Sequence, residues 1–174
     1  TPPSGPWESC VTMASHWKYV PDDDYKSTPE LLRLLVETVA KGGNLLLGVG
    51  PTPEGTLPDP ALERMREIGA WMAINSEAIY GTRPVAPFHD GDVHYTRKDE
   101  WVYAIGVGAE PPQEVELVSL QPWPESPVFL LGWDRPLRWR RDGRAARVTL
   151  NGEALRGALP SGPWVIKFSG ALPD

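Results

Sequence analysis

Asn44 to Val49 reads NLLLGV, a short apolar run that follows Gly42 and Gly43 and ends at Gly50. An unbroken apolar run of this length is typical of a strand buried on both faces, as in a parallel sheet. Such a strand needs a neighbour on each side. The run therefore predicts that this part of the chain belongs to a parallel α/β structure.

Helices are expected on both sides of this run. Residues 27–41 open with a possible capping box, Ser27 and Glu30, carry a proline in the first turn and stop at the Gly-Gly pair. A second helix is expected to open with Asp59 as its cap and Pro60 in its first turn, and to fade near residues 75–81. The predicted apolar faces are Leu31, Leu34, Leu35 and Val39 in the first helix, and Ala61, Met65, Ile68 and Met72 in the second.

The pattern changes near residues 82–88. Short runs then alternate apolar and polar residues and are separated by Gly, Pro or Asp, which is typical of an antiparallel β-sandwich. The predicted division is residues 1–83, the C-terminal part of a (β/α)8 barrel, and residues 84–174, a β-sandwich. Expected strands lie near residues 93–95, 101–107, 115–120, 128–131, 137–140, 148–150 and 164–168.

Composition narrows the possible partners. The 174 residues carry a formal net charge of −6, which argues against a nucleic-acid partner because duplex binders need clustered Lys and Arg. No apolar run is long enough to span a bilayer. Because Thr1 is not a natural start, we expect a truncated or processed chain and assign no compartment from its N-terminus.

Cysteine and histidine usage gives no metal site. The single cysteine, Cys10, cannot form an internal disulfide and is expected to be a small buried hydrophobe. His16, His89 and His94 lack metal-ligand spacing and are expected to be surface or hydrogen-bonded residues. The chain has 8 Trp, a residue that sugar-binding clefts favour, although most are expected to fill cores.

Three strings carry a resemblance to a known family. They are WESC at residues 7–10, KGGNLLLGVGPTPEG at residues 41–55 and NSEAIYGTRP at residues 75–84. In this order and spacing they are similar to the C-terminal barrel segment of family 29 glycoside hydrolases, the α-L-fucosidases. Lys18, Val20 and Gly48 depart from the family pattern, and Val11 stands where some members carry a sugar-site arginine.

The resemblance implies a retaining exo-glycosidase that removes terminal α-L-fucose from a fucosylated glycan without a metal or organic cofactor. Such chemistry uses two carboxyl groups about 5 Å apart. In the family the nucleophile is an aspartate upstream of the Trp-Glu string, so this chain is expected to lack it and to be inactive alone. The remaining barrel would come from an upstream segment or another chain.

The resemblance also suggests site residues. Glu8 and Asp23 are the two candidates for the acid/base, and Trp7, Trp17 and Asn44 are candidates for contacts with the sugar. Four of these five have a structural alternative: Glu8 as a hydrogen-bonded structural carboxylate, Asp23 as part of a solvated acidic turn, Trp17 as core packing and Asn44 as turn chemistry. Two other functions stay open for the whole chain, a non-catalytic carbohydrate-binding module and a structural subunit that completes a barrel.

Overall fold

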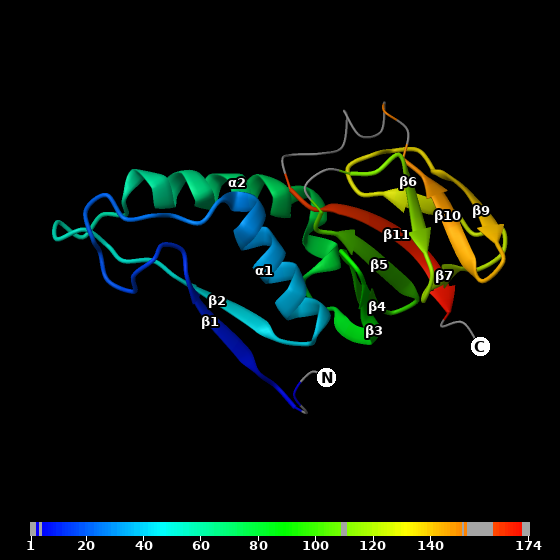
Figure 1. Ribbon diagram of the computed structural model, residues 1–174, viewed down its shortest axis with the longest axis horizontal. Helices are drawn as coiled ribbons and strands as arrows, with labels where there is room; N and C mark the ends of the chain where they lie inside the picture. Colours follow the sequence, from blue (N-terminus) through cyan, green and yellow to red (C-terminus); the bar gives the residue numbers. More distant parts are fainter. Residues whose placement is uncertain (1–2, 4, 109–110, 151, 153–161, 172–174) are drawn as a thin grey trace.

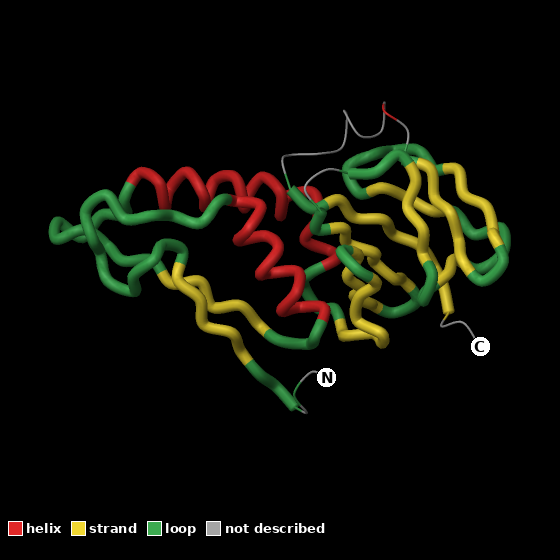
Figure 2. Tube along the Cα trace, in the orientation of Figure 1, coloured by secondary structure: helices red, strands yellow, loops and turns green. Residues whose placement is uncertain are grey.

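The computed structural model describes residues 3, 5–108, 111–150, 152 and 162–171 (Figure 1). Two helices and a parallel strand pair occupy one half of the molecule, and antiparallel strands occupy the other (Figure 2). In chain order the elements are β1 (Glu8–Thr12), α1 (Thr28–Ala40), β2 (Asn44–Gly48), α2 (Asp59–Asn75), the short 3-10 helix η1 (Ser76–Ala78), β3 (Arg83–Asp90), β4 (Val93–Lys98), β5 (Trp101–Gly106), β6 (Glu114–Leu117), β7 (Gln121–Pro122), β8 (Val128–Leu130), β9 (Arg138–Asp142), β10 (Ala145–Thr149) and β11 (Trp164–Ala171).

Helix α1 forms where the local signals place it. The Ser27 side chain accepts a hydrogen bond from the Glu30 amide, and the Glu30 carboxylate accepts one from the Ser27 amide at 2.7 Å, so the predicted capping box is present. After the helix, Gly42 adopts a φ of 82°, a backbone conformation that glycine tolerates best. The fully buried side chains on the helix are Leu31, Leu32, Val36 and Ala40.

Helix α2 departs from the prediction at its start and on its buried face. Its cap is Pro58, without a side-chain hydrogen bond, so Asp59 is the first helical residue and not the cap. Met65 is 43% exposed, whereas Trp71 is fully buried and its indole N–H donates to the Pro163 carbonyl at 2.7 Å. The apolar spacing alone missed Trp71 because the face that packs is chosen by the antiparallel sheet beside the helix.

Strands β1 and β2 pair in parallel, with Glu8 opposite Asn44 and Thr12 opposite Gly48. Helix α1 connects them and packs with α2 against one face, where Leu47 and Val49 contact a cluster of Met13, Leu31 and Ala61. On the other face Leu46 is 45% exposed. The prediction of a strand buried on both faces is therefore wrong for the described chain, in which β1 is the only strand paired with β2.

The antiparallel strands form two sheets, one with the order β6-β10-β9 and a larger one with the order β3-β4-β5-β11-β7, in which β8 also pairs with β11. Side chains from both sheets meet in one apolar cluster, as in a β-sandwich. The fully buried members include Tyr95, Leu117, Val128, Val148 and Phe168. Strand β7 was not predicted, because two residues are too short for an alternating pattern to show.

A second apolar cluster joins the two halves of the molecule. Leu32, Val36 and Trp71 from the helices pack against Tyr103, Ile105 and Val165 from the larger sheet. The helices therefore lie between the parallel pair and the sandwich. Glu77 strengthens this contact, because its carboxylate accepts from the Lys167 ammonium at 2.6 Å and from the Tyr103 hydroxyl at 3.0 Å.

Candidate functional site

The parallel register of β1 and β2 gives the pair two distinct ends. Four residue steps separate Glu8 from Thr12, and the same number separates Asn44 from Gly48. At a rise of about 3.3 Å per residue, the two ends lie roughly 13 Å apart. Residues before the strands and residues after them therefore cannot contact the same pyranose ring.

Trp7, Glu8 and Asn44 lie at the amino ends of the strands. The Trp7 indole covers the Gly42–Gly43 turn and donates to the Lys41 carbonyl at 3.2 Å. The Asn44 backbone N–H donates to the Trp7 carbonyl at 3.0 Å. These contacts tie the start of β1 to the end of α1.

Glu8 is exposed at the same end, and its carboxylate lies 3.7 Å from the Cys10 thiol. Cys10 is itself exposed, so the prediction of a buried cysteine is wrong for the described chain. Cys10 and Glu8 are two residues apart, so their side chains share the face of β1 that the helices leave uncovered. Burial of that face would need strands beyond β1 and β2.

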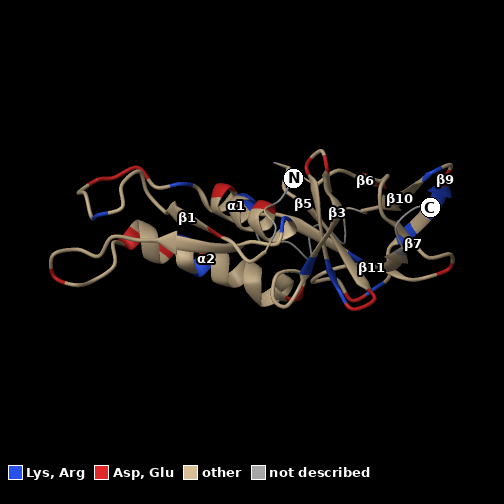
Figure 3. Cartoon of the chain, turned by 90° about the horizontal axis from the view of Figure 1, so that it is seen from below, with Lys and Arg blue, Asp and Glu red and all other residues tan. Residues whose placement is uncertain are grey.

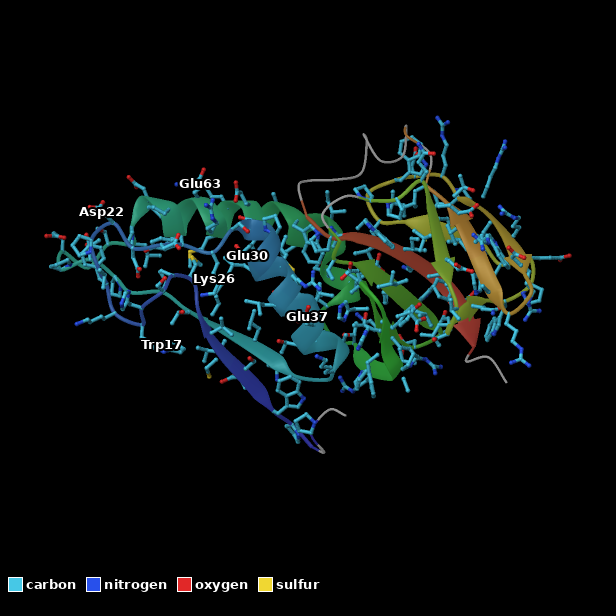
Figure 4. All side chains as sticks on the ribbon, viewed as in Figure 1. Trp17, Asp22, Lys26, Glu30, Glu37 and Glu63 are labelled. Carbon is cyan, nitrogen blue, oxygen red and sulfur yellow. The ribbon has the colours of Figure 1, made fainter. Side chains whose placement is uncertain are left out.

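Trp17 lies beyond the carboxyl ends of the strands. It is 60% exposed, so the alternative of core packing for this residue is wrong for the described chain. Its ring rests on Gly48, where a Cβ would come within 2.7 Å of the Trp17 ring carbon Cζ3. In Figure 4 Trp17 and Asp22 mark the end of the molecule that lies away from the sandwich. The arrangement leaves an indole face open to solvent.

Asp23 lies in the same loop and is held by three donors. The His16 amide donates to Oδ2 at 3.2 Å and the Asp24 amide to Oδ1 at 2.9 Å, while the His16 ring Nδ1 lies 3.1 Å from Oδ1. The Asp23 side chain is only 6% exposed, whereas that of His16 is 56% exposed. The alternative of a solvated acidic turn therefore does not fit Asp23.

These contacts set the charge state of Asp23. Partial removal from solvent raises its pKa, but the hydrogen bonds from His16 and the backbone amides outweigh that effect, so the pKa lies below its ordinary value. The carboxylate is thus ionised near neutral pH. In this arrangement it can orient His16 and leave the Nε2 edge of the imidazole toward solvent.

Lys26 fixes the loop that carries Trp17 and Asp23. Its ammonium donates to the Thr12 carbonyl at 2.9 Å and to the Ala14 carbonyl at 3.3 Å, at the end of β1. Arg64 on α2 donates in turn to the Lys26 carbonyl at 3.1 Å. Sequence reasoning assigned no role to Lys26 or His16, since neither is in a recognised motif and both act through residues seven or more positions away.

Two hollows accompany these ends and differ in chemistry. The one at the carboxyl ends is small, about 10 Å³, and is lined by His16, Tyr19, Asp23 and Gly50 among others. A larger cavity of about 700 Å³ opens at the amino ends, between the helices and residues 79–84. Among the described residues that line it, Arg83 is the only charged one, and none of them is a carboxylate for acid–base chemistry. Among the residues that the structure describes, no group of three or more His, Cys, Asp or Glu gathers as metal ligands.

The structure therefore divides the five predicted site residues into two groups. Asp23 and Trp17 lie together at the carboxyl ends of the strands, and Trp7, Glu8 and Asn44 lie at the amino ends. In barrels of parallel strands, active sites are found at the carboxyl ends.

In the described ranges no helix is long and apolar enough to cross a membrane.

Comparisons with known proteins identify the family. The sequence model of the α-L-fucosidase family matches residues 1–77. An α-L-fucosidase of Branchiostoma floridae is 31% identical over 95% of this chain and 39% of its own length. The plasma α-L-fucosidase of Homo sapiens is 39% identical over 76% of this chain and 31% of its own length.

A solved structure extends the likeness to both halves of the molecule. The α-fucosidase of Thermotoga maritima in complex with fucose superimposes with a TM-score of 0.84, at 25% identity, over 96% of this chain and 40% of that one. The fold is that of a glycoside hydrolase. More narrowly, the chain belongs to the α-L-fucosidase family, and it spans 39% of the length of the Branchiostoma relative.

Proposed function

We propose that residues 1–83 form the last part of a catalytic (β/α)8 barrel and residues 84–174 the C-terminal β-sandwich of a retaining α-L-fucosidase. The observation that carries this proposal is the β1–α1–β2 unit. Its two parallel strands have unpaired outer edges among the described residues, and the face away from the helices is open. Further parallel strands would cover that face and bury Leu46, as a closed barrel does.

The proposed substrate is a glycan with a terminal α-L-fucose, bound at the carboxyl ends of the strands. Trp17 supports this position because it offers an exposed indole face, which suits the C–H face of a pyranose. The amino-end residue Trp7 is then structural, since its indole hydrogen bond closes the turn between α1 and β2, and Asn44 lies at the same end, away from the proposed site.

Of the two carboxylates considered for the acid/base, we favour Asp23 over Glu8. Asp23 lies on the loop that follows the carboxyl end of β1, whereas Glu8 begins that strand at the other end, roughly 13 Å from Thr12. In the present arrangement Asp23 is ionised. A second carboxylate placed about 5 Å away would raise its pKa, because two negative charges so close oppose each other. The acid role therefore depends on the nucleophile being in place.

The reaction would then proceed by double displacement. A carboxylate nucleophile attacks the anomeric carbon of fucose while Asp23 gives a proton to the departing glycosidic oxygen. Asp23 next takes a proton from water, which attacks the same carbon and releases fucose. Of the described residues that line the hollow at this end, Asp23 is the only carboxylate. The nucleophile must therefore come from strands beyond β1 and β2.

A chimera tests the proposal. This chain replaces the matching C-terminal segment of the Thermotoga maritima enzyme, and hydrolysis of 4-nitrophenyl α-L-fucoside is measured. We expect the chimera to hydrolyse the fucoside and this chain alone not to. A chimera that is folded by circular dichroism and inactive would contradict the proposed function, and turnover by this chain alone would contradict the need for a second carboxylate from elsewhere.

Substitutions in the active chimera test the role of Asp23 separately. We expect Asp23→Asn to lower kcat by about 10²- to 10⁴-fold, the usual contribution of a positioned acid/base. Asp22→Asn is the matched control, because Asp22 is exposed in the same loop and the substitution removes the same charge. Equal activity of the two variants would rule out Asp23 as the acid/base while leaving the fucosidase function intact.

A further inference from the structure

A hollow on the sandwich lies at the opposite end of the molecule from the loop with Trp17. Its volume is about 330 Å³, and its six lining residues are Pro122, Pro124, Glu125, Trp139, Arg140 and Arg141. It opens between the segment around β7 and the edge strand β9. Because β1 and β2 point their carboxyl ends away from the sandwich (Figure 1), this hollow is separate from the proposed fucose site.

The hollow has a strongly basic rim on an acidic protein. Strand β9, at this end of the molecule, is coloured largely for basic residues in Figure 3, and these are arginines, whereas the whole protein has a formal net charge of −6. The arginines of β9 and of the turn to β10 are Arg138, Arg140, Arg141 and Arg144. A local excess of positive charge repels itself, so it indicates a site suited to an anion.

Not all of this positive charge is neutralised within the protein. Arg140 donates to Glu114 at 2.9 Å, and Arg147 pairs with Glu114, Glu116 and Asp142. Within the part of the chain that the structure describes, the guanidinium groups of Arg138, Arg141 and Arg144 have no carboxylate partner. Arg141 lines the hollow, so its guanidinium can donate hydrogen bonds to a ligand there.

Trp139 gives the hollow an apolar wall of fixed orientation. Its indole N–H donates to the Ser126 carbonyl at 2.9 Å, and the ring packs against the sandwich core. Successive strand residues point to opposite faces, so Trp139 and Arg141 share one face of β9. An apolar ring beside a guanidinium matches a sugar ring that carries a negative group.

We propose that this hollow binds an anionic saccharide, a sugar with a carboxylate or a sulfate. Arg141 donates to the negative group, Trp139 and the two prolines cover the apolar face of the ring, and Glu125 accepts from a sugar hydroxyl. The volume lies in the range of small-ligand pockets. This site would act beside the proposed fucosidase chemistry and does not depend on it.

The chemistry favours a saccharide over a nucleic acid. The negative charge of Glu125, which lines the hollow, would repel a phosphate backbone. A sugar instead supplies hydroxyl groups that can donate hydrogen bonds to the Glu125 carboxylate. The protein also has a negative net charge, and the basic residues form a patch rather than a long groove. An oligonucleotide is therefore the competing outcome in the test.

The test is a calorimetric titration of this chain with 3′-sialyllactose and with 3′-sulfolactose, and with lactose as the neutral parent. We expect at least one charged sugar to bind at millimolar concentration and lactose not to bind. The sialyl and sulfo arms identify which negative group the site takes. Equal binding of lactose, no binding of either charged sugar, or stronger binding of a single-stranded oligonucleotide would overturn the proposal.

Variants connect the binding to this hollow. Arg141→Gln should weaken binding of the charged sugar about tenfold, the scale of one charge-assisted hydrogen bond. Arg66→Gln is the matched control. Arg66 is exposed on α2, and the substitution removes the same charge far from the sandwich hollow. Both changes are at exposed positions, so thermal unfolding should be unchanged. Equal affinity of the two variants would show that the sugar binds elsewhere.

Discussion

The Trp17 ring occupies the space that a side chain at Gly48 would need, since a Cβ there would lie 2.7 Å from ring carbon Cζ3. The contact places an exposed indole over the end of β2. The absence of a side chain at Gly48 and the position of the ring are therefore physically linked. The relationship predicts how substitution at position 48 acts.

Gly48→Ala should displace the Trp17 ring. Because Trp17 is 60% exposed, the ring can move into solvent, so we expect a change in free energy of unfolding within about 0.5 kcal/mol. The measurement is tryptophan emission and its quenching by iodide, with the Trp17→Phe background used to isolate the signal of that residue. An unchanged Trp17 signal in Gly48→Ala would contradict the contact.

Gly43→Ala should destabilise the protein more strongly. A Cβ at Gly43 would lie 2.5 Å from the Trp7 ring, and Trp7 is held by its hydrogen bond to the Lys41 carbonyl. Overpacking of this kind costs about 1–3 kcal/mol, measured by urea unfolding. The control is Gly69→Ala, since Gly69 lies inside α2 with no atom near its Cβ position, and it should stabilise the helix by roughly 0.5–1 kcal/mol. Equal effects would show that Trp7 does not press on Gly43.

Lys167→Met should weaken the contact between the helices and the sandwich. It removes the 2.6 Å ion pair with Glu77. It also removes the cation–π contact of the Lys167 ammonium, which lies 4.6 Å from the centre of the Trp101 ring. We expect a loss of about 1–2 kcal/mol in urea unfolding, because both partners are partly exposed. Lys98→Met, at an exposed position, serves as the control and should change stability little. A loss no larger than that of the control would mean that the pair contributes nothing.

Stability should fall in mild acid because of His94. Burial lowers its pKa from 6.5 to about 4, and its Nδ1 has no hydrogen-bond partner among the described residues. The prediction of a surface or hydrogen-bonded histidine is therefore wrong at this position. Neighbouring charges modify the shift: Glu37 raises the pKa, whereas His89, Lys41 and Arg33 lower it.

The sign follows from which state takes up the proton. Between pH 6.5 and about 4 the unfolded chain is protonated at His94 while the folded chain is not, so folding loses up to roughly 3 kcal/mol as the pH falls through this window. His94→Gln should flatten that slope in pH-dependent urea unfolding, and His89→Gln should reduce it only slightly, because burial and not His89 is the largest cause of the shift. Asp23, whose pKa is lowered, adds its own loss only at more acidic pH. An unchanged slope in His94→Gln would assign the acid sensitivity to another group.

Local features were predictable because the residues that make them are close in sequence. The capping box of Ser27 and Glu30, the Gly-Gly stop after α1 and most sandwich strands follow from spacing and backbone chemistry. The three motif strings were enough to identify the family. The buried face of α2 was not predictable, because Trp71 packs against strands of the larger sheet and its indole donates to a carbonyl 92 residues away.

The amino-acid sequence by itself determined the two helices, the positions of most alternating strands along the chain and the family, since these depend on neighbouring residues and on short motifs. Only the tertiary structure decided the site. The parallel register of β1 and β2 puts Glu8 and Asn44 at one end and Asp23 and Trp17 at the other, and the fold of the loop pairs Asp23 with His16. The physical reason is that strand direction and pairing, not residue type, determine which side chains share a space.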